Sequence, residues 1–205
     1  GGTLLMPTME DRLEGTTERV QFTVGDAWVE LAQPRSSESP LGRFVDQHGQ
    51  GVYAISVQVE NVAALAARAE SMGAVILKGE TQGESIAIDP KSANGVLLEL
   101  CPEVERVQGR SAFKRFHHVV VAVKDDDAAV ANWEKLFGTE PHPEGPDRIV
   151  QPHHIPVGEA WFGLTSAGTD SNAVGAFLDS RGEGIYLVSV GVDNVQYAAR
   201  GIRQR

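Results

Sequence analysis

Three side chains suited to acid–base or metal chemistry stand in strand-like stretches of this sequence. Glu30 lies in WVELAQP, Glu99 in LLEL and His118 in FHHVVVAV. Carboxylates and imidazoles are groups that proteins use to move protons and to hold divalent metal ions. Alternation places Glu99 on the same strand face as Leu97 and Cys101, which predicts that its carboxylate points inward.

Each of these residues also has an ordinary structural interpretation. Glu30 alternates with Trp28 and Ala32, and a glutamate in such a strand is more often directed to solvent. A single strand histidine such as His118 is usually hydrogen-bonded in the core or at the surface. The pair of histidines in QPHHIPV, His153 and His154, has Val20 and Gln21 at the corresponding positions of the duplication described next, which argues against a shared role.

The sequence contains an internal duplication. GVYAISVQVENV, which begins at Gly51, recurs as GIYLVSVGVDNV from Gly184, 133 residues later (184 − 51). FVDQHGQG and GDAWVEL recur at the same offset as FLDSRGEG and GEAWFGL. A repeat of this length is too long for a solenoid and predicts two homologous domains in tandem. We expect a first domain over residues 1–105, a linker over 106–115 and a second domain over 116–205.

The pattern within each copy predicts modules of the type βαβββ. VYAISVQV alternates and is rich in β-branched residues, as strands are. VAALAARAESM has apolar residues at helical spacing, follows the N-cap residue Asn61 and ends before Gly73. The segments AVILKG, ESIAIDP, GVLLELC, RVQFTV, AWVELAQ, FHHVVVAV, RIVQPHHIPV and EAWFGLTS are predicted strands, and AAVANWEKLF is a second predicted helix.

The predicted fold class is therefore α+β, with paired modules whose sheets curl into an open cup. Measured by the offset, the first copy lacks its opening strand and helix, and the second lacks its last three strands. We expect a fragment, or modules that another copy of the chain completes by swapping, or two chain ends that complete each other. Incomplete modules make a homodimer the expected assembly.

The composition of the chain argues against nucleic acids and membranes as binding partners. The 205 residues carry a net charge of −10, with a pI near 5.0, which argues against binding to phosphate backbones. Cys101 is the single cysteine, so no intrachain disulfide is expected, and a reduced cytoplasmic location fits. No apolar run approaches the length of about 18 residues that spans a membrane. A small-molecule ligand is the expected partner.

Three stretches resemble the vicinal oxygen chelate superfamily, which includes glyoxalase, bleomycin-resistance proteins, extradiol dioxygenases and methylmalonyl-CoA epimerase. They are HHVVVAVKDDDAAVANWEKLFG, GDAWVELAQPRSSESPLGRFVDQHGQG and DPKSANGVLLELCP, and they are most similar to the epimerase branch. The resemblance covers nearly the whole chain apart from the linker. It implies one divalent metal ion in the cup, which stabilises the enolate formed when a carboxylate removes a proton next to a carbonyl.

Carried over residue by residue, the resemblance implies Glu30, Glu99 and His118 as metal ligands, with Co, Ni, Mn or Zn as the ion, or none. Glu99 is also the candidate catalytic residue. Three other ligand positions of the family hold residues whose side chains cannot bind a metal, namely Ala54, Gly163 and Leu187. The candidates for substrate contact are Trp28, Lys91 and Ser92.

Two functions follow, and the sequence does not decide between enzyme and binding protein. The first is metal-assisted proton transfer next to a carbonyl of an acyl-CoA or a small carboxylate, by an isomerase or lyase with a degraded metal site. The second is a non-catalytic, metal-free protein that binds or sequesters a small molecule, because apolar replacements leave a dry cup. A scaffold that assembles through its sheet edges is a weaker third option.

Overall fold

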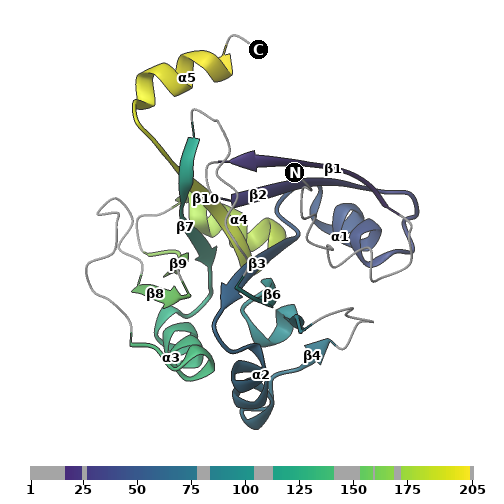
Figure 1. Cartoon of the computed structure of the whole chain (residues 1–205), viewed down its shortest axis with the longest axis vertical. Coiled ribbons are helices and arrows are strands. Elements are labelled where there is room, and N and C mark those ends of the chain that lie inside the picture. The colour runs from purple at the N-terminus through teal and green to yellow at the C-terminus, as the bar shows by residue number, and fades with distance from the viewer. Residues whose placement is uncertain are drawn as a thin grey trace.

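The computed structural model describes residues 17–24, 27–77, 84–103, 113–140, 153–158, 160–168 and 172–203. Ten strands and five α-helices are interspersed along this part of the chain (Figure 1). In chain order they are β1 (Thr17–Val24), β2 (Ala27–Pro34), α1 (Pro40–His48), β3 (Ala54–Val59), α2 (Val62–Ser71), β4 (Ile76–Leu77), β5 (Ile86–Ile88), the 3-10 turn η2 (Pro90–Ser92), β6 (Leu97–Pro102), β7 (Phe113–Ala122), α3 (Asp126–Phe137), β8 (His153–Val157), β9 (Ala160–Thr165), α4 (Asn172–Arg181), β10 (Gly184–Val192) and α5 (Val195–Arg203).

Two four-stranded sheets form the body of the described structure. The first has the order β3-β6-β5-β4, with β3 and β6 parallel, and with α2 it completes one βαβββ module. The second has the order β10-β7-β9-β8, in which β9 lies parallel to β7 and β10 lies antiparallel along its other edge. β1 and β2 form a separate antiparallel pair. These small sheets with interspersed helices confirm the predicted α+β class.

The duplicated segments form matching elements. At the offset of 133 residues, β1 corresponds to β8, β2 to β9, α1 to α4, β3 to β10 and α2 to α5. A ring contact recurs with them, since Phe44 meets Tyr53 at 5.2 Å and Phe177 meets Tyr186 at 5.4 Å, both edge to face. We refer to β1–β6 with their helices as the first repeat and to β7–α5 as the second.

The helix boundaries follow from capping side chains. Asn61 Oδ1 accepts a hydrogen bond of 2.9 Å from the backbone N–H of Ala64, which confirms Asn61 as the N-cap of α2. Asp125 caps α3 in the same way through the N–H of Ala128. Among the described helices, none is long and apolar enough to cross a lipid bilayer.

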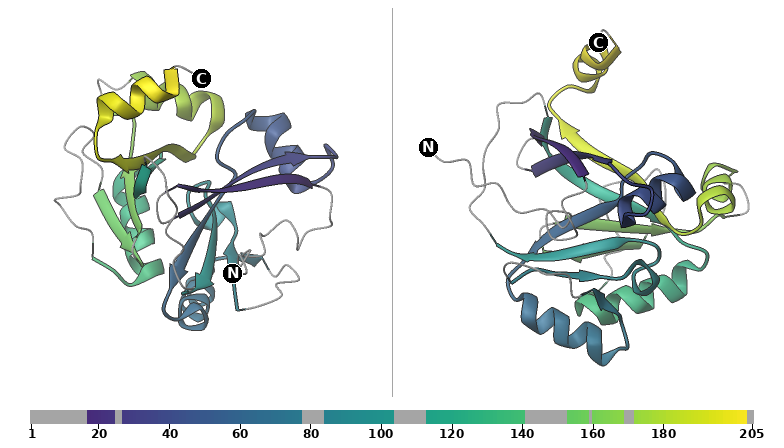
Figure 2. Two further views of the ribbon diagram at one scale, coloured as in Figure 1. Left: turned by 45° about the horizontal axis from the view of Figure 1, so that its top comes forward. Right: turned by 90° about the vertical axis from the view of Figure 1, so that its right-hand side faces the viewer.

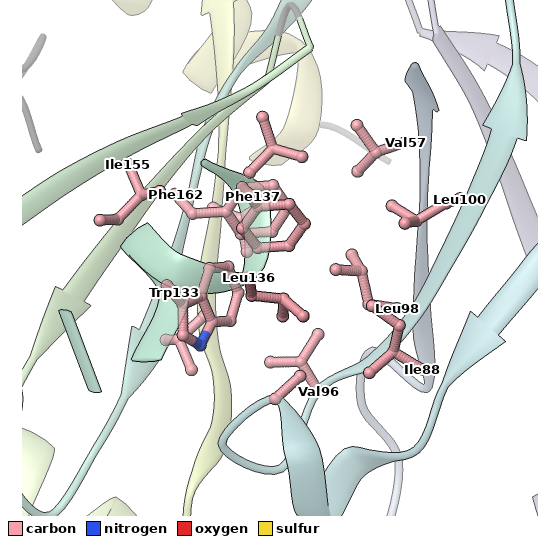
Figure 3. Close-up of a cluster of buried hydrophobic side chains, with 14 of the residues drawn as sticks. Val57, Ile88, Val96, Leu98, Leu100, Trp133, Leu136, Phe137, Ile155 and Phe162 are labelled. Atoms are coloured by element: carbon pink, nitrogen blue, oxygen red, sulfur yellow. The ribbon is translucent and has the colours of Figure 1, made fainter. Parts of the chain in front are cut away.

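One hydrophobic core runs through both repeats. Figure 3 shows side chains of both sheets and of α3 pointing into the same cluster. Trp133 of α3 is fully buried and lies against Phe162 of β9, with ring centroids 5.2 Å apart. Each large side chain buried in this way contributes about 1.5–3 kcal/mol. From the first repeat the cluster includes Val57, Ile88, Val96, Leu98 and Leu100, and from the second Leu136, Phe137, Ile155 and Phe162.

Hydrogen bonds join the two repeats at the edge of this core. The indole N–H of Trp133 donates to Asn94 Oδ1 at 3.0 Å, and the Asn94 amide donates to Glu183 Oε2 at 3.4 Å. The Arg181 guanidinium, at the end of α4, donates to the carbonyl of His48, the last residue of α1, and to that of Gln50 just after it. α2 and α3, one from each repeat, lie side by side in all views (Figures 1 and 2).

Candidate functional site

The first polar site lies on the face of β3 and β6 that is turned away from the core. Leu98 and Leu100 belong to the core, so alternation turns Glu99 between them to the opposite face. Glu99 is 6% exposed, as predicted for an inward carboxylate. Ser56 stands directly opposite on β3 and donates its hydroxyl to Glu99 Oε2 at 2.6 Å, a length typical of a hydroxyl bound to a carboxylate.

A second polar site occupies the corresponding face of β7, β9 and β8. His118 is 4% exposed and His154 is 2% exposed. His154 pairs with Gly163 of β9, and Gly163 pairs with Val120 of β7, two residues beyond His118. Because Gly163 has no side chain, the two imidazoles approach each other across β9, with ring centroids 6.4 Å apart and planes at 77°. Gly163 stands at a ligand position of the superfamily and cannot bind a metal, but its lack of a side chain leaves room for His154 to approach His118.

His117 joins this second site through a β-bulge. Ser189 of β10 pairs with His118 and Val190 pairs with Phe116, so His117 is an extra residue without a partner position in the register. A bulge re-aims side chains that alternation would send to opposite faces. The Nδ1 atoms of His117 and His118 consequently lie 2.9 Å apart. Alternation alone places His117 on the far face, and no local pattern in the sequence marks it as a partner of His118.

Glu30 lies on the separate β1–β2 pair. Its Oε2 accepts a hydrogen bond of 2.6 Å from the Gln21 amide, and its Oε1 lies 3.8 Å from Nε of Arg19. The side chain is 20% exposed, so it is held between strands rather than projected into solvent. Trp28, two residues before it, is half-buried on the same strand face.

Lys91 and Ser92 stand in η2, before β6. Lys91 is exposed, and its backbone N–H donates to Asp89 Oδ1 at 2.8 Å. Ser92 links three segments, because its hydroxyl accepts from the N–H of Val75 and its carbonyl accepts from the Asn132 amide of α3. These contacts are structural, and the role of Lys91 and Ser92 in substrate binding stays a prediction.

The described residues do not fit the divalent ion that the resemblance implies. Across residues 17–203, with the gaps given above, no three His, Cys, Asp or Glu side chains come together as a group that could hold a metal ion. Glu30, Glu99 and His118 belong to three different sheets, and each makes its own contacts there. Their joint role as metal ligands stays a prediction, and the chemistry below is assigned to the side chains themselves.

Comparisons with known proteins support the fold. No family model matches the sequence. The uncharacterized protein YqjC of Bacillus subtilis (strain 168) is 32% identical over 85 residues, which are 39% of this chain and 61% of that protein. A solved mutant of 4-hydroxymandelate synthase from Streptomyces coelicolor aligns with 92% of this chain and 63% of its own, at 17% identity and a TM-score of 0.69, which shows a shared fold.

A third similar protein is methylmalonyl-CoA epimerase from Mycobacterium tuberculosis. It aligns with 48% of this chain and 68% of its own, at 24% identity and a TM-score of 0.41, which is too low to support a further argument. This chain thus spans less than two thirds of YqjC and of the synthase.

Proposed function

The chain has the fold of the vicinal oxygen chelate superfamily, and on that basis we propose that it transfers a proton next to the carbonyl of an acyl-CoA or a small carboxylate, as an isomerase or lyase. Glu99 is the proposed base. The observation that carries the proposal is a carboxylate that is 6% exposed and lies on the face of β3 and β6 turned away from the core. A carboxylate in such a place can abstract a proton bound to carbon if the substrate is positioned against it.

Ser56 supports this role by orientation. Its hydroxyl is bound to Glu99 Oε2, and it comes from the neighbouring strand, so the carboxylate is fixed relative to two strands at once. Interactions of charge are stronger in a water-poor site than at the surface. An acyl-CoA or a 2-hydroxy or 2-oxo carboxylate suits such a base, because each carries an acidic proton next to a carbonyl.

Exchange of that proton with solvent deuterium is the direct test. The purified chain is incubated in D₂O with methylmalonyl-CoA, and separately with small 2-oxo and 2-hydroxy carboxylates, and loss of the α-proton signal is followed by NMR. We expect exchange above the protein-free rate, and Glu99→Gln to slow it by about 10²–10⁴-fold, the usual contribution of a positioned base.

Glu60→Gln makes the same chemical change at an exposed carboxylate just after β3 and is expected to leave the exchange rate unchanged. If Glu99→Gln exchanges as fast as the parent protein, Glu99 is not the base. The same assay with added Co²⁺ and with EDTA, applied also to Glu30→Gln, tests whether a divalent ion takes part.

A second candidate function is metal-free binding of a small molecule. It is favoured by the apolar side chains at two ligand positions of the superfamily, since Ala54 pairs with Leu97 and Leu187 pairs with Val120. Binding sites for small molecules are lined mainly by such residues. Saturable binding of an acyl-CoA without any deuterium exchange would favour this function over the first.

A further inference from the structure

The β1–β2 hairpin exposes a face that is buried in the two equivalent strand pairs of the described structure. Leu31 of β2, Leu100 of β6 and Leu164 of β9 end the related segments VEL, LEL and FGL. Leu100 and Leu164 lie in the hydrophobic core, whereas Leu31 is 62% exposed. Val20, which stands opposite Leu31 on β1, is exposed as well. The hairpin therefore presents to solvent an apolar face of the kind that a helix covers in the other two copies.

β10 and α5 are a strand and a helix with the converse property. The N-caps of α2, α3 and α5 each accept a 2.9 Å hydrogen bond from the N–H three residues later, and they are Asn61, Asp125 and Asn194. Four residues before each cap stands a valine, Val57 of β3, Val121 of β7 or Val190 of β10. Val57 and Val121 are buried, whereas Val190 is 37% exposed. α5 continues this exposed apolar surface with Val195 and Tyr197.

The two exposed surfaces correspond to residues that face each other in the buried copies. Val57 of β3 pairs with Leu100 of parallel β6, and the equivalent residues of β7 and β9 pair in the same register. The third members of these sets, Val190 and Leu31, lie in different sheets. Among the described strands, none pairs with the second edge of β10 or of β2. Of the ten large apolar side chains exposed in the described residues, six lie on β1–β2 and on β10–α5.

We propose that β10 and α5 of one copy of the chain bind the β1–β2 hairpin of a second copy. β2 lies parallel to β10, with Leu31 opposite Val190, as in the two buried copies. α5 covers the hairpin face that carries Val20 and Leu31. The hairpin extends the existing sheet to the order β1-β2-β10-β7-β9-β8. Each copy gives one hairpin and receives one, so the two contacts close a dimer with two-fold symmetry.

A second copy of the chain is the partner that fits this surface. In its own chain β1 touches β7 and β2 touches α1, and neither strand is hydrogen-bonded to β10. α5 carries Arg200 and Arg203 and no acidic residue, whereas the whole chain has a net charge of −10. Opposite charge thus favours contact of α5 with another copy. Pairing also satisfies the backbone groups at two open strand edges and removes apolar side chains from water.

Sedimentation equilibrium of the full chain, without substrate or metal, tests the assembly. We expect a dimer. Leu31→Lys and Val195→Lys each place a charge in the apolar contact, so each should raise the dissociation constant of the dimer by at least about 30-fold, the effect of a hot-spot residue. Val75→Lys is the matched control, because Val75 is also exposed but lies outside both surfaces, and it should leave the constant unchanged. All three side chains are exposed within one chain, so the variants are expected to fold, which circular dichroism checks.

Cysteine cross-linking tests which chain supplies the hairpin. Leu31→Cys and Val190→Cys are made as separate proteins, mixed and oxidised. Residues opposite each other on paired strands lie within the separation of about 4.4–6.8 Å between Cα atoms that a disulfide spans, so we expect a cross-linked pair. A mixture of Leu31→Cys with Val75→Cys should give none, and the native Cys101 is buried.

Three results would overturn the proposal. They are a parent protein that stays monomeric at all concentrations, a dimer that Leu31→Lys leaves intact, and a cross-link that forms only within a chain carrying both cysteine substitutions. The last result would mean that the two ends of one chain complete each other. Neither experiment uses Glu99 or a substrate, so the assembly and the proposed proton transfer can fail independently.

Discussion

At the scale of single residues, alternation along a strand predicts the burial of Glu99 but not the contact between His117 and His118. It predicts that Glu99 points inward beside Leu97 and Cys101, and the carboxylate is buried as expected. The same rule sends His117 and His118 to opposite faces. The bulge overrides this alternation, and it depends on the partner strand β10, which follows β7 by more than sixty residues of sequence. No local pattern reveals such a register shift.

Gly95 offers a test of the contact between the repeats. It has φ +79°, and an added Cβ would lie 2.0 Å from the carbonyl oxygen of Glu183 in the second repeat. Gly73 has the same φ but open space around it. We expect Gly73→Ala to lower the free energy of unfolding by about 1–2 kcal/mol, the cost of a left-handed side chain.

Gly95→Ala should lower it by about 2–4 kcal/mol, because the steric contact adds to the same backbone cost. Urea denaturation followed by circular dichroism measures both variants. Equal losses for the two glycines would mean that the close approach of Gly95 and Glu183 does not contribute to stability.

At the scale of elements, strands and one helix could be predicted from local patterns, whereas α1 and α4 could not. The segment VAALAARAESM forms α2 with the predicted cap, and each strand predicted from an alternating run has a described counterpart, although part of RIVQPHHIPV lies outside the described residues. The blocks FVDQHGQG and FLDSRGEG are recognisable as copies of each other, but their sequences do not predict helices. Each contains the last turn of a helix, α1 in the first block and α4 in the second. These short helices mix polar residues with glycine, and the turn-like PRSSESP before α1 obscures its start.

The N-caps of α2 and α5 make a matched pair at the offset of the duplication. Asn61 and Asn194 each accept a 2.9 Å hydrogen bond from an N–H three residues later. α2 packs into the core, with Ala69 fully buried, whereas Val195 and Tyr197 of α5 are 73% exposed. α5 projects from the top of the molecule in Figure 1.

We therefore expect Asn61→Ala to lower the free energy of unfolding by about 1 kcal/mol. Asn194→Ala should change the global value by no more than about 0.5 kcal/mol, as at other weakly packed sites. Hydrogen exchange of the two helices distinguishes the cases, because Asn194→Ala should raise exchange in α5 alone. A large global effect of Asn194→Ala would contradict the packing described for α5.

At the scale of the whole molecule, the core does not follow the boundary between the repeats. The tandem duplication suggests two units that could fold separately. However, Leu98 and Leu100 of the first repeat share one cluster with Trp133, Ile155 and Phe162 of the second. Packing between distant segments is set by side-chain shape in three dimensions, so sequence similarity between the copies carries no sign of it.

This shared core predicts a single thermal transition. Scanning calorimetry should give a calorimetric enthalpy equal to the van't Hoff enthalpy, the criterion of two-state unfolding. Leu98→Ala in the first repeat and Leu136→Ala in the second should each lower the same transition temperature, with a loss of about 2–5 kcal/mol. Two resolved transitions, each sensitive to one of the variants, would show that the repeats unfold independently.

The indole of Trp133 has an optical consequence. It is fully buried, and it is hydrogen-bonded to Asn94 of the other repeat, whereas Trp28 and Trp161 are half-buried. Its fluorescence therefore reports on the junction between the two copies of the ancestral unit. With the other two tryptophans changed to phenylalanine, a red shift of the emission would show that water has reached Trp133. The protein therefore contains an intrinsic fluorescent probe for the separation of its duplicated halves.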